Sequence, residues 1–187
     1  MTIVLLLVAG FVVVGVVGAV IAIYNHLVHL RFGVDKSWAN IDVLLKQRRD
    51  ELPKIIDTCK GYLKYEQTLL ERLTAARTAF LGASTADAKV QAENEISRVL
   101  KNVFAVAENY PDLKANQNFL QLQSRVSTLE NNIADRRELF NESVNLYNVK
   151  INQFPDMFLA RSMNYVPMTL LEIPKEETAD VKVDFGT

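Results

Sequence analysis

The side chains that could do chemistry in this chain are few and lie far apart. The only histidines, His26 and His29, are three residues apart on one face of a predicted helix, where they could bind a metal ion or sense pH. No carboxylate follows them before Asp35, so we interpret them as polar residues beside a membrane and predict no metal site. Cys59 is the only cysteine, which excludes an intramolecular disulfide and a cysteine-based zinc site and is typical of a small buried apolar group.

Sequence patterns of known catalytic sites are also missing. The chain has no glycine-rich phosphate loop, no G-x-S-x-G turn and no cysteine–histidine pair suited to nucleophilic catalysis. It also lacks the Glu-x-x-His motif of di-iron helical bundles. We therefore predict a protein that is not an enzyme and needs no cofactor. The alternative, an unrecognised enzyme, would require a deep polar pocket with perturbed titrating groups.

Several charged residues fall in phase with apolar helix positions. Arg48 and Glu66 do so in the helical region after the membrane segment, and Arg136 does so near the middle of the chain's last long helix. A buried unpaired charge is costly, so we predict an internal polar network in which Glu66 or Glu108 pairs with an arginine and fixes the helix register. The alternatives are that these side chains extend to the bundle surface, or that they form a proton relay.

A second polar pattern is a series of asparagines spaced four, three and four residues apart: Asn141, Asn145, Asn148 and Asn152. Asparagine is a poor helix former, so four of them on one face predict hydrogen bonds across a helix–helix contact, within one subunit or between subunits. A simple polar flank is the alternative.

The element that begins the chain is apolar. Residues 3–23 carry no charge, and about 20 residues at ~1.5 Å each span the roughly 30 Å hydrocarbon layer of a membrane. A basic amino-terminal region and a clear cleavage site are absent, so we predict a retained single-pass anchor, with a cleaved signal peptide as the alternative. Small residues on one face would let a membrane helix of another molecule approach closely, unless lipid covers them. They are Gly15, Gly18, Ala19 and Ala22.

The distribution of positive charge predicts an orientation. Two uncharged residues precede the apolar segment, whereas basic residues follow it: Arg31, Lys36, Lys46, Arg48 and Arg49. Because positive residues tend to stay in the cytoplasm, the amino terminus is predicted to lie outside and the remaining chain in the cytoplasm.

The rest of the chain is predicted to be all-α. Between residues 38 and 80, apolar positions alternate at three and four residues, which predicts one long helical path that Pro53 kinks or splits. A second helix over about 85–109 follows Gly82 and a cap formed by Ser84 with Asp87, and a third covers about 113–153. Short connections predict antiparallel neighbours.

The predicted organisation is therefore an anchor and juxtamembrane segment at residues 1–30, an elongated antiparallel bundle at 31–154 and an irregular tail at 155–187. The bundle would have three long helices, or four if the first splits at Pro53. The tail is rich in proline and apolar residues, and residues 181–185 alternate like a strand. It could dock on the bundle, contact the membrane or add to a neighbouring subunit, and we favour docking over disorder.

Charge argues against binding to nucleic acid. Residues 24–154 carry 18 Lys/Arg and 16 Asp/Glu, a net charge of +2, and residues 155–187 carry 3 and 6, a net charge of −3. Neither part has the strong basic bias that nucleic-acid binding needs.

Several sequence motifs stand out in the helical region. They are Trp38, the Arg48-Arg49-Asp50 triplet, Pro53, Gly61-Tyr62 and the AENYPDLKAN run at residues 107–116. Through these motifs the chain resembles the LemA family of bacterial membrane-anchored helical proteins over about residues 24–155. The resemblance implies a single amino-terminal membrane helix, a helical bundle and no established enzymatic activity.

Taken together, these features favour a non-enzymatic scaffold or organiser that self-associates at the bacterial inner membrane. Its expected partners are the lipid bilayer and further copies of the chain, with a protein partner of unknown identity also possible. The alternative is an adaptor or sensor that passes a membrane signal to a protein such as a membrane protease.

Overall fold

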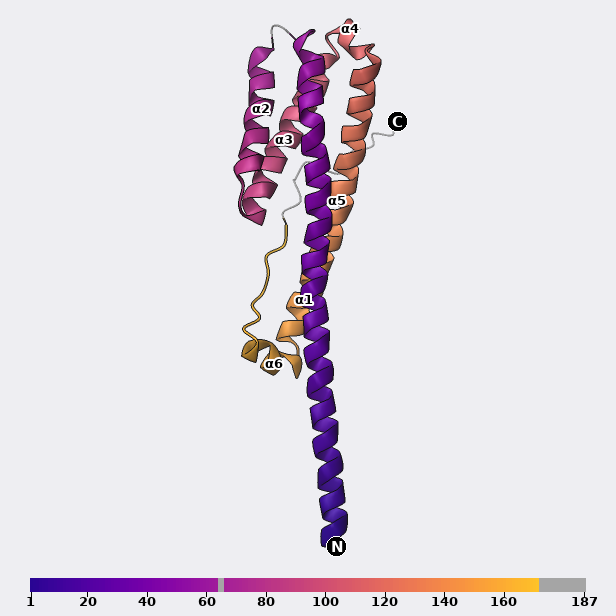
Figure 1. Ribbon diagram of the computed structural model, residues 1–187, viewed down its shortest axis with the longest axis vertical. Helices are drawn as coiled ribbons and strands as arrows, with labels where there is room; N and C mark the ends of the chain where they lie inside the picture. Colours follow the sequence, from indigo (N-terminus) through magenta and orange to yellow (C-terminus); the bar gives the residue numbers. More distant parts are fainter. Residues whose placement is uncertain (64–65, 172–187) are drawn as a thin grey trace, which may run out of the picture. The chain divides into compact units, whose positions relative to one another are not determined.

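The computed structural model describes residues 1–63 and 66–171. In this part of the chain the structure consists of helices without strands (Figure 1), which confirms the predicted all-α class. The helices are α1 (Thr2–Lys60), α2 (Gln67–Gly82), α3 (Ala86–Ala107), α4 (Pro111–Lys114), α5 (Gln117–Asn152) and α6 (Asp156–Ser162). The strand-like pattern predicted at residues 181–185 lies outside the described residues.

The chain divides into two compact units. The anchor unit comprises Met1–Ala39 and Glu138–Leu170, and the bundle unit comprises Asn40–Arg137 with Leu171. Helices α1 and α5 contribute residues to both units. Each unit combines separate stretches of chain, so these spatial units differ in kind from the consecutive segments 1–30, 31–154 and 155–187, and that segmentation stays a prediction.

The beginning of α1 is an apolar rod that nothing in the described chain covers. Residues 1–22 are all exposed, and this part of the helix has a mean hydropathy of 3.0, enough in length and composition to cross a membrane. Burial begins after this apolar stretch, with Leu27 fully buried and Val34 nearly so. Within the anchor unit, packing against protein therefore starts where the apolar run ends.

Pro53 does not interrupt α1. The helix runs through it to Lys60 and the first break comes at Gly61, so of the predicted kink or split at the proline, the split is wrong. Proline lacks the amide hydrogen that would bond the carbonyl of Arg49, but Leu52 and Ile55 on either side are fully buried. Packing of this apolar face outweighs the missing hydrogen bond.

Helices α2 and α3 form a hairpin in the bundle unit and lie side by side (Figure 1). Leu73, Ala76 and Phe80 form the buried face of α2. The cap of α3 is Thr85, whose hydroxyl accepts a hydrogen bond from the Ala88 amide at 3.2 Å, and not the predicted Ser84.

The predicted third helix begins in two pieces. The single turn α4 ends at Lys114, and Asn116 then caps α5 by accepting hydrogen bonds from the amides of Asn118 at 2.9 Å and Phe119 at 3.1 Å. At the other end α5 stops at Asn152. Phe154, two residues beyond the end of α5, is 76% exposed.

Candidate functional site

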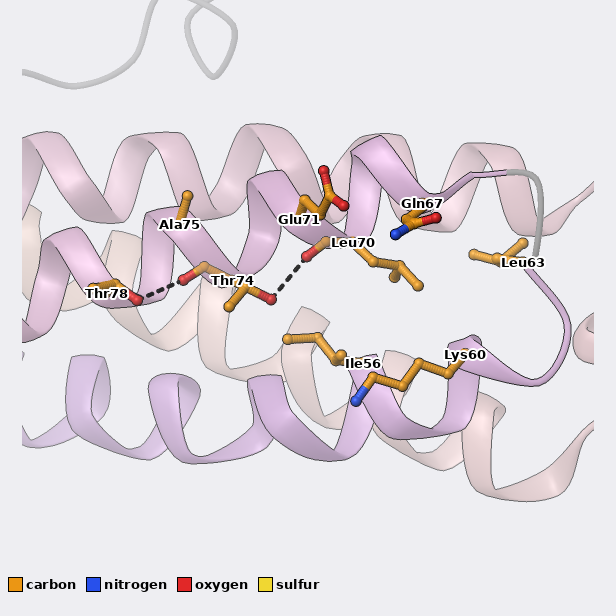
Figure 2. A pocket seen from close by; sticks show the side chains of 9 residues that line it. All are labelled: Ile56, Lys60, Leu63, Gln67, Leu70, Glu71, Thr74, Ala75 and Thr78. Carbon is orange, nitrogen blue, oxygen red and sulfur yellow. Dashed lines mark hydrogen bonds between the residues drawn. The ribbon is translucent and has the colours of Figure 1, made fainter.

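A groove opens between the last turns of α1 and the helix α2 (Figure 2). It lies entirely within the bundle unit and has a volume of about 740 Å³. Its lining residues are Ile56, Lys60, Leu63, Gln67, Leu70, Glu71, Thr74, Ala75 and Thr78.

The floor of the groove is apolar and preformed. Ile56 and Leu70 are each 9% exposed and Leu63 is 1% exposed, so their side chains are held in place by the bundle. Ile56 and Lys60 are one helical turn apart on α1, and Leu70, Thr74 and Thr78 are successive turns on α2. The side chains of each wall therefore lie in a row along one face of their helix.

The two threonines on the α2 wall offer no free hydroxyl hydrogen to the groove. The Thr74 hydroxyl donates to the carbonyl of Leu70 at 2.9 Å, and the Thr78 hydroxyl donates to the carbonyl of Thr74 at 2.9 Å (Figure 2). Both hydroxyls are therefore satisfied within their own helix, which leaves mainly methyl groups for a ligand. The groove suits the apolar face of an amphipathic helix, with Glu71 on one wall and, on the other, Lys60, whose ammonium group also pairs with the exposed Asp57 carboxylate at 3.2 Å.

A buried charge cluster lies elsewhere in the bundle unit. Arg48, 1% exposed, donates to the Ser97 hydroxyl at 2.8 Å and to the main-chain carbonyl of Glu93 at 3.1 Å. It also pairs with the Glu93 carboxylate, and its other terminal nitrogen lies 3.4 Å from Oε1 of Glu130. One arginine thus joins α1 to both α3 and α5.

Glu93 is as deeply buried as the arginine that it binds, with no exposed surface. Burial raises the pKa of its carboxyl above the ordinary value, while the charge and hydrogen bonds of Arg48 act in the opposite direction. Beside it, the nearly buried Arg137 donates to Oδ1 of Asn94 at 3.2 Å. A polar cavity of about 310 Å³ adjoins Arg48 and Arg137. The cluster joins α1, α3 and α5, and its role in fixing the register of these helices stays a prediction.

The predicted network included Arg48, which is buried in the structure, but its observed partners differ from the predicted ones. Glu66 precedes α2 at its N-cap position, Glu108 is exposed and pairs with Lys114, and Arg136 is exposed. The predicted burial of a Glu66–Arg136 pair is therefore wrong.

The buried charged residues that the prediction missed, Glu93 and Arg137, are in phase with the apolar stripes of their helices. Glu93 lies three residues before the buried Ile96, and Arg137 lies four residues after Ile133 and three before Phe140. This spacing is the signal that could have identified both residues, because it places them on the faces that these apolar residues bury.

The four asparagines have different environments. Asn148 binds the main chain of Met168 twice, donating to its carbonyl at 2.8 Å and accepting from its amide at 2.9 Å. Asn152 donates locally to the carbonyl of Asn148 at 2.8 Å, Asn145 is exposed and Asn141 is half-buried. Asn148 thus holds a non-helical segment of the same chain, in the anchor unit, against α5.

The remaining candidate residues all lie on α1. Gly15, Gly18, Ala19 and Ala22 are exposed on α1, and a contact between membrane helices at these positions stays a prediction. Both histidines are exposed as well, and no group of three metal-binding side chains occurs among residues 1–63 and 66–171. Cys59 is fully buried, and burial raises the pKa of its thiol to about 12, so it is an apolar core group and not a nucleophile.

Comparison with known proteins gives a family match over most of the chain. The family model described as LemA family matches residues 37–185. Protein LemA of Metamycoplasma hominis is 24% identical over 158 residues, covering 84% of this chain and 72% of that protein. Two proteins of Paramagnetospirillum magneticum, named Magnetosome protein MamQ 1 and MamQ 2, are each 19% identical over 174 residues, covering 79% of this chain and 64% of their own length.

Proposed function

The chain belongs to the LemA family, and from this premise we propose that it is a non-enzymatic, membrane-anchored scaffold that self-associates at the bacterial inner membrane. Family membership and the apolar first helix indicate a membrane-associated helical protein. The observation that carries the further step to a scaffold is the preformed apolar groove between α1 and α2.

A second copy of the chain is the occupant that we propose for this groove. Lys60 stands on the α1 wall and Glu71 on the α2 wall, so the groove presents one positive and one negative side chain. Two copies related by a two-fold axis would place each Lys60 near the partner's Glu71 while the apolar floors face each other. Such a contact uses the same residues on both copies and needs no other protein.

The anchor offers a second surface for self-association. One helix of the described chain has the length and composition to span a membrane, and we propose that a helix of a second copy packs against it there. Gly15 and Gly18 have no other group within 4 Å of the position that a Cβ atom would take. With Ala19 and Ala22 they would allow two helix backbones to approach closely in lipid, where such packing stabilises association.

We place the amino terminus outside the cell and the bundle in the cytoplasm, because basic residues such as Arg31 and Lys36 follow the apolar segment. A Thr2→Cys variant tests this orientation. If the amino terminus is outside, its thiol should react with a membrane-impermeant maleimide added to spheroplasts. The native Cys59 is buried and should not compete for the reagent. Labelling only after the membrane is opened would reverse the assignment.

The molar mass of the full-length protein in mild detergent tests self-association. We expect light scattering that separates protein from micelle to give a defined oligomer, and Ala75→Arg to shift it towards monomer. Ala75 is exposed and lines the groove, so the longer side chain would fill the groove without disturbing the core.

Ala79→Arg is the matched control for this experiment, because Ala79 is equally exposed on α2, one turn further on, and does not line the groove. Gly18→Leu tests the anchor surface separately. An oligomer unaffected by Ala75→Arg would reject the groove as the contact. Wild-type protein that stays monomeric over a wide concentration range would reject the scaffold and favour the adaptor, whose groove holds a helix of another protein.

A further inference from the structure

Two aromatic side chains stand out from the surface of the anchor unit just after α5. Phe154 is 76% exposed and Phe158 is 62% exposed, and their rings pack edge to face with centroids 6.0 Å apart. Arg161 is exposed one turn after Phe158 on α6. We call Phe154, Phe158 and Arg161 the aromatic face.

The opposite side of α6 is fixed to the protein. Ala160 is 1% exposed and Asp156 is 3% exposed, and the Asp156 carboxylate lies 3.2 Å from the ammonium group of Lys150 on α5. Asp156 and Ala160 are one turn apart on this inner side, so Phe158, midway between them, points to the other side. The aromatic face is therefore held outward and is not a loose end of chain.

The register of α1 and α5 places the aromatic face near the end of the apolar segment. In the anchor unit the Ser37 and Ser143 hydroxyls are 3.0 Å apart, the Trp38 and Phe140 rings are 5.9 Å apart, and the two helices run in opposite directions (Figure 1). Counting from these contacts at ~1.5 Å per residue, α5 ends about 5–8 Å along the α1 axis from Ile23.

Burial along α1 agrees with this register. Leu27 is fully buried, whereas every residue before Ile23 is exposed. A membrane-spanning α1 would leave the hydrocarbon layer near Ile23. The last turn of α5, the turn that contains Phe154 and the helix α6 therefore lie close to this boundary.

We infer that the aromatic face rests on the bilayer that holds the anchor, with both rings at the boundary between headgroups and acyl chains. Phenylalanine is among the residues that interfacial helices bury at this depth, and the Arg161 guanidinium one turn away would meet the lipid phosphates. The inference rests on the proposed membrane anchorage and adds a second membrane contact, one that sets the anchor unit against the lipid surface.

Spin labelling of the full-length protein tests this contact. Phe158→Cys carries a nitroxide in vesicles of phosphatidylethanolamine and phosphatidylglycerol, because the native Cys59 is buried and does not compete for the label. We expect relaxation of the nitroxide by oxygen, which concentrates in lipid, to exceed relaxation by a water-soluble nickel chelate several-fold. Phe154→Cys should give the same result.

Leu81→Cys is the matched control, since Leu81 is 54% exposed in the bundle unit, and its label should respond mainly to nickel. Vesicle-bound protein whose label at position 158 responds like the control would overturn the inference while leaving anchorage intact. Strong spin–spin broadening at 158 would assign the face to a second copy and also overturn it. Protein that fails to float with the vesicles would reject anchorage itself.

Discussion

Replacing Arg48 with alanine is expected to lower the free energy of unfolding of the full-length protein by about 3–5 kcal/mol. The substitution leaves the fully buried Glu93 carboxylate without the arginine that binds it and removes the donor to Ser97 and to the Glu93 carbonyl. Urea unfolding in mild detergent, followed by helical circular dichroism, measures the change.

The neighbouring Arg49→Ala is the control for this loss. Its guanidinium pairs with the exposed carboxylate of Asp50 at 2.8 Å, and such pairs contribute about 0–1 kcal/mol. Combining Arg48→Met with Glu93→Leu should recover much of the stability, because an apolar pair can replace a buried ion pair of similar volume. Equal losses for Arg48→Ala and Arg49→Ala would show that the buried cluster does not stabilise the bundle.

The destabilisation by Arg48→Ala is also expected to grow with pH. In the native protein burial already raises the pKa of Glu93 above its ordinary value, and removing Arg48 removes an effect that opposes this rise. A carboxyl whose folded-state pKa exceeds its unfolded-state pKa loses stability as the pH rises through that interval. The difference between variant and wild type should therefore be smaller at about pH 5 than at about pH 8, and a constant difference would contradict the role of Glu93.

Pro53→Ala is expected to stabilise the bundle by as much as about 3 kcal/mol, the usual difference between proline and alanine inside a helix. Alanine supplies the missing amide hydrogen to the carbonyl of Arg49, and α1 already has helical geometry on both sides of the site. The denaturant midpoint should rise while the dependence of the free energy on denaturant stays the same.

Lys54→Ala is the control for helix propensity, since Lys54 is the next residue of α1 and its side chain is exposed. It should change the free energy of unfolding by no more than about 0.5 kcal/mol. A destabilised Pro53→Ala variant would mean that the half-buried proline ring contributes packing that exceeds the backbone cost.

The positions of the helices could be read from the sequence because apolar residues recur at helical spacing over long stretches. That spacing did not locate the break between α1 and α2, since the three-four pattern continues by chance across the turn through Tyr62 and Glu66. The break expected at Pro53 rested only on the local backbone chemistry of proline. The helix continues through Pro53 because tertiary packing buries Leu52 and Ile55 beside it.

The candidate site was harder to predict than the fold. The buried charge cluster has a sequence signal, because Glu93 and Arg137 complete apolar stripes, but the pairing of Arg48 across helices depends on their rotation and axial offset. The groove has no such sequence signal. Its walls come from two helices, α1 and α2, so it depends on how these helices pack against each other.

The bond between Asn148 and Met168 has a consequence for solubility. Residues 165–170 form a non-helical stretch whose main-chain groups, like those of a sheet edge, could pair with an extended segment of another molecule. The Asn148 amide already occupies both the N–H and the C=O of Met168, and the Tyr147 hydroxyl donates to the carbonyl of Val166 at 3.2 Å. Two side chains of α5 thereby take up hydrogen-bonding groups through which this stretch could otherwise seed aggregation.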